Sequence, residues 1–134
     1  ADASLMLASS HQWPLYPGTG APHETGVGNI FNATLPPGAD GAAFRAVWQR
    51  ELLPALDAFA PDLLIISAGF DAHMADPLAQ LRLVEADFAW ITEQLCALAT
   101  RHAAGRVVSL LEGGYDLQAL GASVAAHVRA LMLN

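Results

Sequence analysis

Hydrophobic residues form two short continuous runs in this chain, and a polar, glycine-containing segment directly follows each of them. The runs cover residues 63–66 (Leu-Leu-Ile-Ile) and 107–111 (Val-Val-Ser-Leu-Leu). A strand that is buried on both faces of a parallel sheet has this near-continuous aliphatic character. The polar segments at 67–73 and 112–116 are therefore predicted to follow the carboxyl ends of two parallel strands, where open α/β sheets bind their ligands.

Apolar residues recur at helical spacing in three other stretches, which predict helices over residues 41–59, 85–102 and 117–131. Pro54 should kink or split the first of these helices near Glu51. The residues of the last helix that are predicted to face inward are Leu117, Leu120, Val124, Val128 and Leu131.

The two ends of the middle helix are unequal. Val84 stands where a Ser, Thr or Asp side chain would accept the first free backbone N–H, so the start is predicted to be poorly capped. Gly105 is placed to cap the other end.

The first third of the chain predicts a strand at residues 5–8 and a further extended segment at 30–35. Residues 9–29 between them are dense in Pro, Gly, His and Trp, and a loop of this length in a compact protein is more often functional than a linker. Strand, helix, strand and helix in succession predict an α/β protein with right-handed parallel crossovers.

Composition limits the size and the partners. With 134 residues, of which 54% are hydrophobic and 14% charged, the chain forms one domain or part of one. A net charge of −7 argues against nucleic acid or an anionic membrane as a partner. Cys96 is the only cysteine and is predicted to be a buried apolar residue. No run resembles a membrane span or a signal peptide, so we expect a cytoplasmic protein.

The polar segments contain the candidates for chemistry. Asp71 is either a metal ligand or charged catalytic residue at a strand end, or an ordinary turn residue; His73 and Asp76 nearby favour the first interpretation, although Asp76 before a proline also fits a plain turn. Tyr115 is either a core aromatic residue or, since glycines precede it, a phenol that donates a hydrogen bond to a developing oxyanion.

The sequence does not contain other common catalytic or binding motifs. The histidines lack zinc-signature spacing, and we expect His102 and His127 on the surface or at helix ends. A Gly-x-Ser-x-Gly nucleophile motif is missing, and Gly-Thr-Gly at 18–20 lacks the helix that a phosphate-binding loop needs. Dinucleotide binding is therefore a weaker alternative.

Taken together, the polar segments resemble a known family. The relevant motifs are Ser-His-Gln-Trp-Pro-Leu-Tyr-Pro-Gly-Thr-Gly at 10–20, Gly-Val-Gly-Asn at 26–29, Ser-Ala-Gly-Phe-Asp-Ala-His at 67–73 with Asp-Pro-Leu at 76–78, and Leu-Glu-Gly-Gly-Tyr at 111–115. In this order they resemble the histone deacetylase family, in its class II and bacterial deacetylase-like branch, over nearly the whole chain.

This resemblance implies a zinc-dependent amide hydrolase with the three-layer, parallel-sheet arginase/deacetylase fold. Asp71 matches a zinc ligand of the family, and Tyr115 matches the tyrosine that polarises the acyl carbonyl and stabilises the oxyanion. Tyr16 and Leu78 match walls of the channel that admits the acyl-lysine side chain, and the Gly114 carbonyl would face the substrate. The resemblance also implies a structural monovalent cation, such as K+, near the backbone oxygens of Ser9 and Ser10.

The family's other zinc ligands, an Asp-x-His pair, and its tandem catalytic histidines lie upstream of the first strand seen here. We therefore expect residues 1–134 to be the C-terminal part of a single deacetylase domain, inactive without the remainder of that domain. The complete protein would deacetylate an acetyl-lysine peptide or an acetylpolyamine.

Two alternatives compete with this interpretation. A noncatalytic interaction module could keep the fold, but it would have no physical need for both Asp71 and Tyr115. An arginase-like metallohydrolase shares the fold but needs several carboxylates after the equivalent strand, whereas a single Asp71 with His73 fits a deacetylase better. The acyl group, the substrate and the formation of a homo-oligomer stay open.

Overall fold

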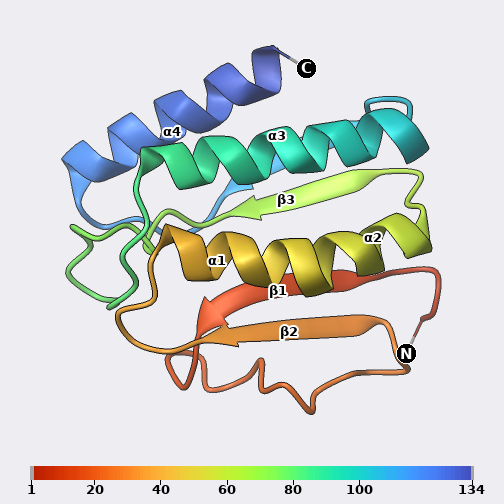
Figure 1. Cartoon of the computed structure of the whole chain (residues 1–134), viewed down its shortest axis with the longest axis horizontal. Helices are drawn as coiled ribbons and strands as arrows, with labels where there is room; N and C mark the ends of the chain where they lie inside the picture. The colour runs from red at the N-terminus through yellow and green to blue at the C-terminus, as the bar shows by residue number, and fades with distance from the viewer. Residues whose placement is uncertain (1, 134) are drawn as a thin grey trace.

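Strands and helices alternate along most of the chain (Figure 1). The computed structural model describes residues 2–133. The elements are β1 (Leu7–Gln12), β2 (Ile30–Leu35), α1 (Gly41–Val47), the π-helical segment η1 (Trp48–Leu52), α2 (Leu53–Phe59), β3 (Leu64–Ala68), α3 (Glu85–His102), β4 (Val107–Leu111) and α4 (Leu117–Met132). In this described part, no helix combines the length and the apolar composition that crossing a membrane requires.

The strands form two parallel pairs. β1 lies beside β2, with Leu7 opposite Ile30, and β3 lies beside β4, with Leu64 opposite Val107. Within residues 2–133, β1 and β3 are not hydrogen-bonded to each other, so each keeps one edge without a strand partner. Helices α1 to α3 run along the strands and share one apolar core with them (Figure 1). The parallel α/β arrangement predicted from the sequence is confirmed.

The strand β1 is longer and lies further along the chain than predicted. It continues to Gln12, through polar residues that the prediction assigned to the following loop. These side chains have partners: Ser10 Oγ accepts a hydrogen bond from Trp48 Nε1 at 2.9 Å, and Gln12 forms two hydrogen bonds of 2.8 and 2.9 Å with Gln80. Hydrophobicity predicts only where the apolar residues stop, but the backbone pairing of β1 continues through polar residues. The same applies to β3, which continues to Ala68, beyond the end of the apolar run at residue 66.

The long helix predicted over residues 41–59 is split, as Pro54 indicated. Pro54 has no N–H to donate to the carbonyl of Arg50, four residues earlier. The backbone accommodates this with a π-helical turn, in which the Leu53 N–H donates to the Trp48 carbonyl, five residues back. The interruption near Glu51 is therefore confirmed.

Helix α3 has the predicted bounds, but its start is better capped than the sequence indicated. Val84 contributes no acceptor; instead, the Asp87 carboxylate accepts a hydrogen bond from the Val84 N–H at 3.0 Å and forms an ion pair with Arg45 Nε at 2.9 Å. The missing side-chain cap at Val84 is thus confirmed, and the Asp87 carboxylate adds a contact that the sequence did not indicate. At the other end, the Gly105 N–H donates to the Ala99 carbonyl at 3.0 Å, which confirms Gly105 as a cap.

The packing face of helix α4 overlaps only in part with the one predicted. Leu117 is 82% exposed and Val128 is 42% exposed, so neither faces the core. Leu120 and Val124 do pack against the core, but the buried residues of the helix are Ala119, Ser123, His127 and Ala130. The small side chains among them let α4 approach α3 closely. His127, which was predicted on the surface or at a helix end, is instead buried, because Thr92 and Ser109 supply hydrogen-bond partners for its ring.

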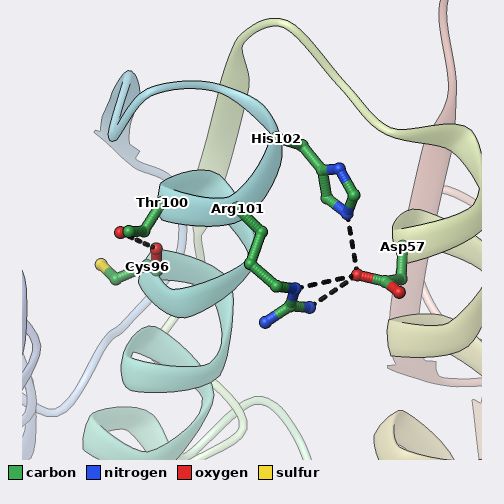
Figure 2. Close-up of polar contacts among 5 residues, drawn as sticks. All are labelled: Asp57, Cys96, Thr100, Arg101 and His102. Carbon is green, nitrogen blue, oxygen red and sulfur yellow. Dashed lines mark hydrogen bonds and ion pairs between the residues drawn. The ribbon is translucent and has the colours of Figure 1, made fainter.

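A polar cluster joins α2 to the end of α3 (Figure 2). One carboxylate oxygen of Asp57 accepts hydrogen bonds from Arg101 at 2.6 Å and from His102 Nε2 at 2.9 Å. These bonds, with that of Arg101 the stronger, hold the pKa of Asp57 below its usual value. The position of His102 at a helix end is confirmed, and Cys96 is a buried free cysteine, as predicted.

Candidate functional site

Asp71 lies in the loop that directly follows β3, and its carboxylate rests against the backbone of the loop that follows β4. A Cβ atom on Gly113 would lie 2.5 Å from Oδ2 of Asp71, closer than atoms can pack. Only glycine at position 113 therefore permits this carboxylate position. Two strand ends that are far apart in the sequence thus meet at one carboxylate.

Backbone hydrogen bonds hold these two loops together. The Phe70 N–H donates to the Gly113 carbonyl at 2.8 Å, and the Glu112 N–H donates to the Ala68 carbonyl at 2.9 Å. The β3 and β4 loops therefore act as one unit, with Asp71 on one side and Tyr115 on the other.

The surroundings of Asp71 disfavour a bare negative charge. Burial raises the pKa of Asp71 above its ordinary value, and the nearby charge of Asp76 raises it further, while the backbone N–H of Asp71 acts in the opposite direction. A bound cation relieves this penalty because it compensates the charge. Asp71 therefore suits a metal ligand, although residues 2–133 contain no group of three His, Cys, Asp or Glu side chains arranged to hold a metal.

His73, which the sequence placed near Asp71, has other partners. Its Nδ1 accepts a hydrogen bond from the Ala75 N–H at 3.1 Å, so the ring proton of the neutral form is on Nε2. Nε2 lies 3.5 Å from a carboxylate oxygen of Glu85, and the ring stacks on Phe88. His73 therefore connects the loop to the start of α3.

Tyr115 projects from the β4 loop with its side chain 55% exposed. The preceding residue, Gly114, has a φ of +139°, which L-residues with a side chain rarely adopt. The Tyr115 N–H donates to Oδ2 of Asp76 at 2.9 Å. This bond ties the backbone of Tyr115 to the segment that follows Asp71.

A cavity of about 880 Å³ separates β1 from β3 and reaches Asp71. Residues of both strands line it, and among them Leu7 and Ile65 are 54% and 59% exposed. Tyr16 also lines this cavity and is itself almost fully exposed. Two unpaired strand edges with exposed apolar side chains therefore face a common space.

The other residues predicted by resemblance are spread around this site. Leu78 is 66% exposed, and Leu78 and Gly114 lie outside the residues that line the cavity. Ser9 and Ser10 lie on β1 and line it, with their hydroxyls bonded to His11 Nδ1 and Trp48 Nε1. The channel and the cation site stay predictions.

Sequence reasoning missed the role of Asp76, which is 8% exposed and bonded to the Tyr115 backbone. The hint was present, since Asp76 follows Asp71 by a few residues, but a turn before proline explained it equally well. The contact with Tyr115 spans 39 positions and is set by the fold.

Sequence comparison with known proteins matches almost the whole chain to one protein family. Residues 1–131 match the histone deacetylase domain family. Histone deacetylase 10, chloroplastic, of Oryza sativa subsp. japonica is 38% identical over 135 aligned residues, covering 98% of this chain and 30% of that protein. A probable deacetylase of Archaeoglobus fulgidus is 38% identical, with 87% of this chain and 34% of that protein covered.

A solved structure agrees with these sequence matches. The crystal structure of the HDA15 HD domain superposes with a TM-score of 0.85 at 33% identity, covering 96% of this chain and 37% of that one. The chain thus spans about a third of the length of the proteins that it matches.

Proposed function

Because the chain belongs to the histone deacetylase family and has its fold, we propose that the complete protein is a zinc-dependent deacetylase. Its substrate is an acetyl-lysine peptide or an acetylpolyamine. The observation that carries the proposal is the placement of the Asp71 carboxylate against Gly113, beside the loop that presents Tyr115. A metal ligand and a phenol donor are thereby held on two adjoining strand ends.

Asp71 is the residue of this chain that would hold zinc, since its partly buried carboxylate lacks a compensating charge. When bound, zinc would supply Lewis-acid chemistry, polarising the acyl carbonyl and lowering the pKa of a bound water. Tyr115 donates its phenol proton in a hydrogen bond to the carbonyl oxygen, and this bond strengthens as negative charge develops there. Tyr16 and Leu78 form walls of the channel for the methylene stem of the acyl-lysine, and the Gly114 carbonyl faces the substrate.

One carboxylate does not complete a catalytic zinc site, which normally has three protein ligands. We propose that the remainder of the domain supplies the other ligands and the catalytic histidines. The cavity between β1 and β3 supports this, because its two unpaired parallel edges and exposed apolar side chains suit an inserted extended segment. Residues 1–134 alone are then inactive, and K+ binds near the Ser9 and Ser10 carbonyls of the assembled domain.

The test compares the complete protein with residues 1–134 alone. Zinc per chain is measured by elemental analysis, and turnover is measured with an acetylated lysine peptide and with an acetylpolyamine. We expect zinc and turnover in the complete protein only. Stoichiometric zinc in residues 1–134 alone would contradict the divided ligand set, and a complete protein that binds zinc but hydrolyses neither substrate would contradict the deacetylase proposal.

A further inference from the structure

We propose that Asp76 is a positioning residue that fixes Tyr115, the oxyanion donor, through its backbone. The inference rests on the proposed function, since it assigns a role to Tyr115 in that reaction. Its structural basis is the contact between the Asp76 carboxylate and the Tyr115 N–H, at 2.9 Å.

Both oxygens of the Asp76 carboxylate are used. Oδ2 accepts from the Tyr115 N–H, and Oδ1 accepts from the Leu78 N–H at 2.9 Å. Asp76 is 8% exposed, so water competes little for these bonds. Hydrogen bonds to a buried, charged acceptor are stronger than bonds between neutral groups. A single carboxylate thus sets the backbone at Tyr115 and at a residue of the predicted channel wall.

Tyr115 needs such a restraint. Two glycines precede it, and this backbone is intrinsically free. Its side chain is 55% exposed, so packing on the ring contributes little to its position. The next residue, Asp116, caps the start of α4, where its carboxylate accepts a hydrogen bond from the Ala119 N–H at 2.8 Å. Tyr115 lies between the two glycines and this helix cap. There, the hydrogen bond from its N–H to the Asp76 carboxylate connects it to the segment that follows Asp71.

The two hydrogen bonds from backbone N–H groups also argue against Asp76 as a metal ligand. Each carboxylate oxygen of Asp76 already accepts a backbone N–H, whereas the Asp71 carboxylate lies against the Gly113 backbone and burial raises its pKa. Asp76 should therefore affect the rate of the reaction through Tyr115 without changing the amount of zinc bound.

The first test is Asp76→Asn in the complete, zinc-loaded protein. One carboxylate oxygen becomes an NH2 group, which cannot accept from an N–H. We expect kcat to fall by about 10-fold to 10²-fold, since a small displacement of a catalytic group costs up to about 10² in rate, while zinc content stays unchanged. Asp40→Asn, the same chemical change at the exposed cap of α1, is the matched control and should keep kcat.

A double-mutant cycle separates positioning from general structural damage. If Asp76 acts through the Tyr115 hydroxyl, Asp76→Asn should lower kcat by less than about 2-fold once Tyr115→Phe is present. An equal loss in both backgrounds, an unchanged kcat in the single variant, or a loss of zinc in the single variant would each overturn the proposal.

Amide hydrogen exchange at Tyr115 tests the contact independently of activity. Asp76→Asn should speed exchange at the Tyr115 N–H by 10-fold or more, and unchanged exchange would overturn the proposal. If the complete protein has no deacetylase activity, faster exchange still establishes the contact while the proposed function fails. Should Asp76→Asn not fold, Asp76→Glu keeps the charge and displaces the oxygens, and it should produce the same loss of kcat and faster exchange; normal values for both would contradict the role.

Discussion

The hydroxyl of Thr92 on α3 and Nδ1 of His127 on α4 lie 2.7 Å apart. The Thr92 hydroxyl donates to the Phe88 carbonyl at 2.6 Å, so it accepts from His127, and Nδ1 carries the ring proton. Nε2 is then free to accept from the Ser109 hydroxyl, at 2.8 Å. The neutral ring satisfies both partners and connects α3, α4 and β4 behind the Asp71 loop, where it also contacts Phe70 edge-on.

Burial lowers the pKa of His127 below its ordinary value of 6.5. The unfolded chain therefore takes up a proton near pH 6.5, whereas the folded chain does so only at lower pH. Because the unfolded state then binds more protons, the free energy of unfolding should fall as the pH drops below about 6.5. Urea denaturation between pH 7.5 and pH 5 measures this dependence.

His127→Gln should reduce the pH dependence of the unfolding free energy, because it removes the titrating group. It should also lower stability at pH 7.5 by about 1–3 kcal/mol, since buried polar partners lose hydrogen bonds. His23→Gln, at an exposed loop position, is the control and should keep the dependence. An identical pH dependence in His127→Gln and the unsubstituted protein would show that His127 is not responsible for it.

The sequence predicted α3 correctly and the packing face of α4 only in part, for one physical reason. On α3, large apolar residues form the buried stripe, so periodicity identifies it. On α4, the closely packed residues are small or polar, as with Ser123, which is fully buried. A hydrophobic stripe does not reveal a contact that depends on small volume or on hydrogen bonds with another element.

Asp71→Asn tests the metal ligand. A neutral amide is a weaker ligand for zinc than a carboxylate, so the complete protein should lose most of its zinc, and its activity should fall in proportion. Titration with a zinc chelator, with zinc content measured by elemental analysis, gives the change in affinity. Asp62→Asn, at an exposed position before β3, should bind zinc normally. Full zinc retention in Asp71→Asn would remove Asp71 from the ligand set.

Tyr115→Phe tests the oxyanion donor. The substitution removes the hydroxyl and keeps the ring, so kcat should fall by about 10²–10³ while zinc content stays the same. Steady-state kinetics on an acetyl-lysine peptide, together with elemental analysis, separate these effects. Full activity in this variant would show that another group stabilises the oxyanion.

The motifs singled out Asp71, Asp76 and Tyr115, but they did not indicate the contact between Asp76 and Tyr115, and they did not mark Asp87. Motifs identify residues next to each other in the sequence, whereas these two carboxylates contact distant parts of the chain: Asp76 contacts Tyr115, and Asp87 contacts Arg45 of α1. These contacts exist only after the elements have packed, so local motifs in the sequence do not reveal them.

Val84→Thr tests the capping of α3. Val84 has the extended backbone of a cap residue, and its side chain offers no acceptor, so the Asp87 N–H donates to the Val84 backbone carbonyl at 2.9 Å instead. A threonine hydroxyl there can accept this N–H, while the Asp87 carboxylate already accepts from the Val84 N–H at 3.0 Å, so the substitution completes a capping box. We expect the free energy of unfolding to rise by about 0.5–1 kcal/mol in urea denaturation. Val84→Ala removes the partly exposed apolar side chain without adding an acceptor, so it should give no such gain; equal stabilisation by both variants would trace the effect to the lost valine rather than to the cap.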